Sequence, residues 1–286
     1  MGRLEEIVLQ QDTRNIAKLK DYVSHTFLSD AAKEILNRKG TVFIITGFYI
    51  VYANASETDG PVGAIAISRA LKKMGYKVVF ITDKWSFDVM KGLIDGEDEL
   101  VNFPVTNHSS SESFSNNLIL KYSPSVVLSI ERASLVKDGT YRNWKGQDIS
   151  DYNAKLDYLF DQNQYSIGIG DGGNEIGMGN LSEQIKKIKG LPDNPSSTNV
   201  NNLIIASCSN WGGYGLVAAL SILVKQNLLI SADEAKKLII KSVDLGAVEG
   251  LTGKADYAVD GRDLEDDSVC IIQLHDFLNE LGYFAA

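Results

Sequence analysis

The sequence has few of the residues that mark disulfide-rich or zinc-binding proteins. Its 286 residues include only two cysteines, Cys208 and Cys270, and three histidines. Both cysteines lie in apolar runs far apart in the chain, so we expect buried free thiols, which fit a reducing compartment. The histidines are isolated from one another, and no Cys/His cluster indicates zinc.

The sequence also lacks a long apolar run and an excess of positive charge. No stretch approaches the length that spans a bilayer, and the first fifteen residues carry early acids instead of the apolar segment of a signal peptide. The formal net charge of -9 argues against binding to nucleic acid or to an anionic membrane. We therefore expect a cytoplasmic protein that acts on a small molecule and has no nucleic-acid or membrane partner.

What the sequence has is an alternation of buried strands and helices. Short β-branched apolar runs are typical of strands buried on both faces of a sheet. They occupy 41–46, 77–82, 125–130, 165–169 and 203–207, with a weaker edge segment at 100–105. Helical patterns lie between and around them at 4–10, 14–23, 30–38, 61–74, 84–93, 109–121, 151–160, 180–189, 216–225, 232–243 and 267–281.

This alternation predicts an α/β fold with an open, mostly parallel sheet flanked by helices, similar to a Rossmann fold. We expect a single main domain, with a core at 41–225 and helical additions at 1–40 and 226–286.

The most unusual stretch is 165–180, YSIGIGDGGNEIGMGN, in which glycines interleave with Asp171, Asn174 and Glu175. Glycine is unfavourable inside helices and strands, so this density indicates a backbone that turns sharply or approaches something closely. A dinucleotide fingerprint fits poorly, because two carboxylates would stand where a pyrophosphate lies against a helix N-terminus. The stretch favours a site for a cation or an amine.

Polar, glycine-containing segments follow four of the predicted strands at their carboxyl ends. In open parallel sheets, ligands bind in the crevice outside those ends. The side chains that we expect to converge there are Glu57, Asp59, Glu131, Asp138, Asp171, Glu175 and Asn210. Crowded carboxylates raise one another's proton affinity unless a cation lies between them. The cluster therefore predicts acid–base chemistry or a Mg²⁺ or Mn²⁺ site, with Glu57, Asp59, Asp171 and Glu175 as ligands.

Several of these residues also have a structural interpretation. Asp59 and Asn210 each precede or open a predicted helix and are candidate N-caps. Glu131 and the adjacent Arg132 are a possible ion pair at a strand end, and Asp138 followed by glycine is an ordinary turn signal. The Asp171–Glu175 segment is the one for which function explains the residues better than structure does.

With these residues in place, the chain resembles the D-glutamate cyclase family, in its C-terminal catalytic-type domain. The matching segments lie in family order between 41 and 225. They are TGF at 46–48, ETDGPVGA at 57–64, ERAS at 131–134, KDGTYRNWKGQDIS at 137–150, GIGDGGNEIGMGN at 168–180 and SNWGGYGL at 209–216. The second and fifth segments are distinctive. ERAS stands where the family tends to have ERAG.

The resemblance implies reversible dehydration of an acidic amino acid, D-glutamate, to 5-oxo-D-proline. On this basis Asp171 or Glu175 is the expected base, and Glu57 or Glu131 the expected acid. The expected substrate contacts are Asp59, Arg132, Arg142, Asn174, Asn210 and the backbone amides of Gly172 and Gly173. The alternatives are a metal-dependent hydrolase such as a phosphatase, which would use the same acids, and a non-catalytic small-molecule sensor. No cofactor is required with certainty, and a homo-oligomer is possible.

Overall fold

The computed structural model describes residues 1–160 and 164–284, so the last two residues of the predicted C-terminal part lie outside it. Its centre is a six-stranded sheet in which every neighbouring pair is parallel. The spatial order is β5-β4-β1-β6-β7-β8. The strands are β1 (Thr41–Thr46), β4 (Lys77–Asp83), β5 (Glu99–Phe103), β6 (Pro124–Ile130), β7 (Tyr165–Gly170) and β8 (Asn202–Ile205). The predicted α/β fold with an open parallel sheet is confirmed.

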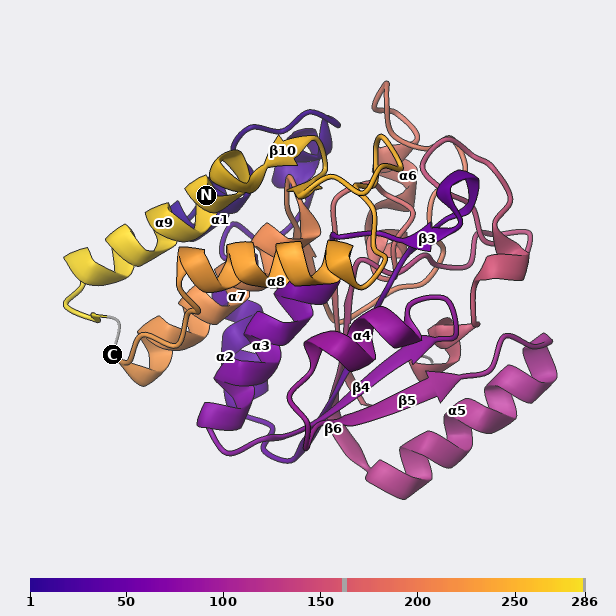
Figure 1. The fold of residues 1–286 in the computed structure, drawn as a ribbon, viewed down its shortest axis with the longest axis horizontal. Helices are drawn as coiled ribbons and strands as arrows, with labels where there is room; N and C mark the ends of the chain where they lie inside the picture. Colours follow the sequence, from indigo (N-terminus) through magenta and orange to yellow (C-terminus); the bar gives the residue numbers. More distant parts are fainter. Residues whose placement is uncertain (161–163, 285–286) are drawn as a thin grey trace.

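Helices flank this sheet, as Figure 1 shows. They are α1 (Arg3–Val8), α2 (Phe27–Leu36), α3 (Pro61–Lys73), α4 (Phe87–Leu93), α5 (His108–Tyr122), α6 (Ser182–Ile185), α7 (Ser209–Val224), α8 (Ala232–Asp244) and α9 (Leu264–Glu280). Short 3₁₀ helices are η1 (Ile16–Tyr22), η2 (Val51–Ala53), η3 (Ser150–Tyr152), η4 (Leu156–Leu159) and η5 (Met178–Leu181). Two small hairpins pair β2 (Tyr49–Ile50) with β3 (Ala55–Ser56) and β9 (Ala258–Val259) with β10 (Arg262–Asp263).

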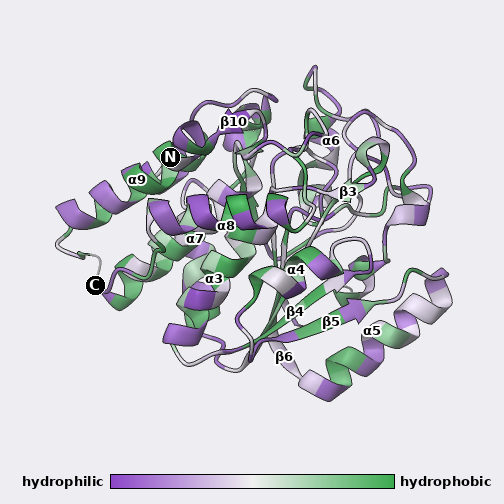
Figure 2. Ribbon diagram, in the orientation of Figure 1, coloured by the Kyte–Doolittle hydropathy of each residue, from purple (hydrophilic) through white to green (hydrophobic). Residues whose placement is uncertain are grey.

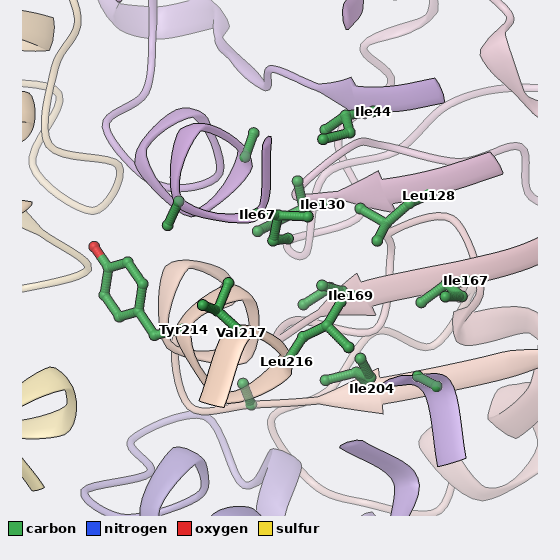
Figure 3. Packing of buried hydrophobic residues seen from close by; sticks show 14 of the residues in the cluster. Ile44, Ile67, Leu128, Ile130, Ile167, Ile169, Ile204, Tyr214, Leu216 and Val217 are labelled. Atoms are coloured by element: carbon green, nitrogen blue, oxygen red, sulfur yellow. The ribbon is translucent and has the colours of Figure 1, made fainter. Parts of the chain in front are cut away.

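The two faces of the sheet are covered by different helices because side chains alternate along each strand. Ile44 of β1 lies on the side of α3 and α7, where Ile67 and Leu216 meet the strand residues (Figure 3). The neighbouring Phe43 makes an edge-to-face contact with Tyr122 of α5, with ring centroids 5.6 Å apart. Both faces of the central strand are thus buried, which explains its continuous apolar sequence.

Helices α3 and α7 pack unusually closely. A Cβ atom added at Gly213 of α7 would lie 3.1 Å from the Cα atom of Gly63 in α3. Glycine at both positions therefore lets the two backbones approach each other. This contact fixes the starts of α3 and α7 beside each other, next to the carboxyl ends of β1 and β6.

The helices at the surface are amphipathic. Figure 2 shows both hydrophilic and hydrophobic residues along α8 and α9. Arg3 of α1 pairs with Glu280 at the end of α9, so the first and last helices lie side by side. Among the described residues, no helix is long and apolar enough to cross a membrane.

Several helix predictions are wrong in extent or type. Helix α7 begins at Ser209, not at 216, because its glycines serve close packing and do not form a loop. Helix α2 begins at Phe27, not at 30. The segment 14–23 contains a 3₁₀ helix, 151–160 contains two, and 180–189 contains one followed by a single α-helical turn.

Candidate active site

A cavity of about 200 Å³ lies at the carboxyl ends of β1 and β6. These two strands are neighbours at the point where the strand order reverses, which is where open α/β sheets bind ligands. The hairpin β2–β3, the turn at 143–147 and the segment 250–251 surround it. Its lining residues are Arg14, Phe48, Tyr49, Ile50, Val51, Tyr52, Glu57, Glu131, Asn143, Trp144, Lys145, Gln147, Asn174, Glu175, Gly250 and Leu251.

Three predicted acids, Glu57, Glu131 and Glu175, line this cavity together. Each is at most 6% exposed. A fourth, Asp171, is fully buried behind the lining, and one of its oxygens lies within 4.8 Å of oxygens of Asp59 and Glu131. The topology therefore gathers acids that are more than a hundred positions apart in sequence.

Arg14 is the cation of this cluster, and sequence reasoning missed it. Its guanidinium donates to Asp171 through one amino group and to Asp260 through the other, the latter at 2.6 Å. Arg14 precedes η1 and lies 157 positions from Asp171, so no local pattern marks it. The planar fork suits this bridge between two carboxylates, which a single ammonium cannot reproduce.

Glu57 and Glu131 have a strong affinity for protons. Burial raises the pKa of Glu57 well above its ordinary value, and the nearby charges of Asp260 and Asp59 raise it further. Burial likewise raises the pKa of Glu131 well above its usual range, with Asp171 and Glu175 adding to the effect. One carboxylate oxygen of Glu57, Oε1, is buried without a hydrogen-bond partner among the described residues.

Two effects act in opposite directions on the pKa of Asp171. Burial raises its pKa well above the ordinary value, although the guanidinium of Arg14 acts in the opposite direction. The raised proton affinity of these acids follows from crowding without enough positive charge. The cluster therefore holds protons or requires a further cation.

Glu175 is held differently from the other glutamates. Its two oxygens accept hydrogen bonds from the backbone amides of Gly172 and Gly173, both at 2.8 Å. These bonds favour the ionised form and partly offset the burial that raises the pKa of Glu175. The two amides are consequently taken up by Glu175 and are not free to bind an oxyanion in this arrangement.

Glu131 stands in a strained backbone conformation where β6 ends. Its φ angle of 46° lies in the left-handed region, which non-glycine residues rarely adopt. Its Oε2 accepts a hydrogen bond of 2.6 Å from the hydroxyl of Ser209, the first residue of α7. Strain of this kind clusters at functional sites, and here it accompanies the placement of a carboxylate at the cavity.

The two predicted arginine contacts lie outside the cavity lining. Arg132 is fully buried, pairs with Asp83 and donates to the carbonyl of Gly47 at 2.7 Å. It does not form the local ion pair with Glu131 that its position suggested. Arg142 pairs with Asp138 at 3.1 Å. Both guanidiniums therefore stabilise loops around the site.

Asp59 and Asn210 are also absent from the cavity lining, whereas Asn174 is part of it. The α3 cap predicted for Asp59 is wrong, because the N-cap residue is Gly60, which has no side chain. Asp59 instead accepts hydrogen bonds from backbone amides at the start of α7. Asn210 is likewise bound to backbone amides at the start of α3.

The acids offer oxygen ligands of the kind that Mg²⁺ and Mn²⁺ prefer. Of the predicted ligands, Asp59 and Glu175 already accept backbone amides through both oxygens. Asp171 has an unpartnered buried oxygen, Oδ2, and lies near Glu131. Among the described residues, Asp59, Glu131 and Asp171 form one group that could hold a divalent cation, since one oxygen of each lies within 4.8 Å of the others.

Comparison with known proteins gives a consistent picture. The family model described as "D-glutamate cyclase-like, C-terminal" matches residues 4–275. The human protein "D-glutamate cyclase, mitochondrial" is 30% identical over 207 residues, which cover 66% of this chain but only 34% of the relative. The chain thus spans about a third of that relative's length.

Among solved structures, a ligand-free aldohexose dehydrogenase from Thermoplasma acidophilum matches with a TM-score of 0.25 and 11% identity, over 65% of this chain and 61% of that one. So weak a likeness says nothing about the site. The family match, in contrast, extends over nearly the whole sequence and includes every acid of the cluster. The chain belongs to the D-glutamate cyclase-like, C-terminal family.

Proposed function

We propose that the chain is an enzyme that converts D-glutamate reversibly to 5-oxo-D-proline and water. The observation that supports this most directly is the meeting of Glu57, Glu131 and Glu175 around one small cavity. Their environments differ, and groups whose proton affinities differ can divide acid and base roles between them. Family membership and the name of the human relative point to the same reaction.

The reaction closes one ring and moves two protons from the nitrogen to the departing oxygen. The α-ammonium of the substrate loses one proton, the resulting amine attacks the protonated γ-carboxyl carbon to form the new C–N bond, and the nitrogen then loses its second proton. A C–O bond of the tetrahedral intermediate breaks, and the departing hydroxyl leaves as water after it gains a proton. Because nucleophile and electrophile belong to one molecule, holding the closed conformation supplies much of the rate advantage.

In the proposed mechanism Glu175 is the base. The hydrogen bonds from Gly172 and Gly173 stabilise its ionised form, which can bind the ammonium and accept its proton. Asp171 is less suited to contact the substrate, because it lies behind the lining and pairs with Arg14. Its charge instead contributes to the raised proton affinity of Glu131.

Glu57 is the proposed acid. Burial and neighbouring acids raise its pKa, so its carboxyl group keeps a proton that it can give to the departing oxygen. Its Oε1 is buried without a hydrogen-bond partner among the described residues, and the residue itself lines the cavity. Glu131, fixed by the hydroxyl of Ser209, would stabilise the tetrahedral intermediate as a second protonated carboxyl.

A second candidate function is metal-dependent hydrolysis, for example of a phosphate ester. The closeness of carboxylate oxygens of Asp59, Glu131 and Asp171, within 4.8 Å of one another, favours it. Mg²⁺ or Mn²⁺ there would polarise a carbonyl or phosphoryl oxygen. In that case Glu131 and Asp171 would bind the cation, and Glu57 and Glu175 would position a water.

One experiment separates these functions. The protein is incubated with D- and L-glutamate and with both 5-oxoproline enantiomers, with and without Mn²⁺, and the products are measured by mass spectrometry. Loss or gain of one water on the D-enantiomers, resistant to EDTA, is the expected result. Turnover that depends wholly on added metal would favour the second function, and no turnover under any condition would contradict cyclisation.

The cellular setting stays a prediction. We retain the cytoplasmic location, although the name of the human relative assigns that protein to mitochondria. The two cysteines are free and buried, which is compatible with a reducing compartment. The absence of a nucleic-acid partner and the possible homo-oligomer also remain predictions from the sequence.

A further inference from the structure

The charges around the cavity are arranged unevenly. Of the described residues that line it, two carry a positive charge, Arg14 and Lys145. Arg14 is already committed, because its two amino groups pair with Asp171 and Asp260. Lys145 forms no ion pair with any described acid, and its Nζ lies 4.9 Å from the ring centroid of Trp144. The cavity therefore has an acidic wall and one unpaired cation.

Lys145 lies in a hydrogen-bonded turn. The side-chain oxygen of Asn143 accepts hydrogen bonds from the amides of Lys145 and Gln147, at 3.1 and 3.0 Å. The amides of Asn143 and Gly146 close the turn through the carbonyls of Gln147 and Asn143. Gly146 has a φ angle of 80°, a conformation that favours glycine. The backbone that carries Lys145 is thus held by four hydrogen bonds within the turn.

We propose that Lys145 binds the α-carboxylate of the substrate and so determines specificity for an α-carboxylated ligand. This inference rests on the proposed function. During cyclisation the amine and the γ-carboxyl react, and both must face the glutamates that exchange protons with them. The α-carboxylate does not react, remains in the product and would be repelled by the acidic wall. An ammonium on the cavity lining is its natural partner.

The neighbouring cations cannot take this role in the described structure. Arg132 is buried and paired with Asp83, and Arg142 is paired with Asp138 and absent from the cavity lining. Lys145 is therefore the residue on which recognition of the unreactive carboxylate depends. A ligand without that carboxylate should gain no affinity from Lys145.

Two ligands isolate this contact. 5-Oxo-D-proline carries the carboxylate, whereas 2-pyrrolidinone is the same lactam ring without it. Calorimetry on the full chain measures the affinity of each for the wild type and for K145A, K145R and K137A. Lys137 lies on the same loop, is absent from the lining and is paired with Glu183, so K137A removes an equal charge as the matched control.

The expected result is selective. K145A should weaken the affinity for 5-oxo-D-proline by about tenfold or more, because the carboxylate loses a charge-assisted hydrogen bond. The affinity of K145A for 2-pyrrolidinone should equal that of the wild type. K145R should retain most of the preference for 5-oxo-D-proline over 2-pyrrolidinone. K137A should bind both ligands as the wild type does. In turnover, K145A should raise KM far more than it lowers kcat.

The outcomes separate the inference from the function on which it rests. If the wild type prefers the acid and K145A keeps that preference, the role of Lys145 is wrong while cyclisation stands. If K145A loses the preference but no variant turns over D-glutamate, Lys145 recognises the carboxylate and cyclisation is wrong. If the wild type binds neither 5-oxo-D-proline nor glutamate, both proposals are overturned.

Discussion

Asp59 and Asn210 exchange helix caps across the interface of α3 and α7. The carboxylate of Asp59 accepts hydrogen bonds from the amides of Ser209 and Asn210 at the start of α7, at 2.9 and 2.7 Å. The side-chain oxygen of Asn210 accepts from the amides of Gly60 and Gly63 at the start of α3, at 3.0 and 2.7 Å. Each residue therefore satisfies the free amides of the other's helix.

Removing either cap should destabilise the protein. We expect D59A and N210A each to lower the free energy of unfolding by about 1–3 kcal/mol, because buried amides lose their acceptors. Since both residues belong to one network, the double variant should lose less than the sum. Urea denaturation measures all three values. S231A, which removes the cap of the separate helix α8, is the control, and its effect should add to that of N210A.

Arg14 should matter for stability in a pH-dependent way. R14A leaves the buried carboxylates of Asp171 and Asp260 without their cation, which typically costs about 3–5 kcal/mol. The loss should shrink as the pH falls and Asp171, whose pKa burial raises, is protonated, because a protonated carboxyl needs no counter-charge. Unfolding curves of R14A and the wild type across pH measure this difference.

The matched control for R14A is R3A, which removes an exposed pair with Glu280. Its cost should be much smaller than that of R14A, because exposed ion pairs contribute little to stability. R14K keeps the charge but not the fork, so it should recover only part of the stability. A loss in R14A that does not vary with pH would contradict the assigned role of Arg14.

Much of the sheet is predictable because its strands are buried on both faces. The sequences of β1 and β6 are apolar along their length, and the structure confirms strands there. The start of α7 was not predictable from local rules. Gly212 and Gly213 suggest a loop, whereas packing against α3 makes glycine favourable inside this helix. Tertiary contact overrides local preference at such positions.

Only the part of the candidate site that follows from the order of the parallel strands was predictable from the sequence. Acids that follow parallel strands must meet at one edge, and Glu57, Glu131 and Glu175 do line one cavity. The pattern could not reveal Arg14, which comes from a segment outside the sheet. Nor could it distinguish Arg142 from Lys145, because which side chain of a tight turn faces a cavity depends on three-dimensional contacts.

Replacing the two glutamates proposed as acid and base should affect stability in opposite ways. E57Q removes a crowded carboxyl group whose Oε1 lacks a partner, so the free energy of unfolding should stay constant or rise. E175Q places amide hydrogens near the donors of Gly172 and Gly173, which should cost about 1–3 kcal/mol.

Turnover should fall by about a hundredfold or more in E57Q, the size of effect expected for a lost general acid. Single-turnover measurements with D-glutamate test this at saturating substrate, and thermal unfolding of the same samples shows that the variant is folded. A folded E57Q with the wild-type rate would exclude Glu57 as the acid.

Asp267 should make the protein less stable as the pH rises. Burial in α9 raises the pKa of Asp267 from an ordinary value of 3.8 to about 7, although the indole N–H of Trp211 donates to it at 3.0 Å. Between these two values the folded state binds the proton and the unfolded state releases it. The stabilisation from this group is therefore complete below about pH 4 and is lost as the pH approaches 7.

D267N tests this, because the amide keeps an acceptor for Trp211 and cannot ionise. Relative to the wild type, the variant should gain a few kcal/mol of unfolding free energy between pH 4 and pH 7, since each unit of pKa shift is worth about 1.4 kcal/mol. D276N, at an exposed position on the same helix, should leave the pH profile of the wild type unchanged. If the difference between D267N and the wild type is constant across this range, the pKa of Asp267 is not raised in the folded protein. Burial would then not govern its proton affinity.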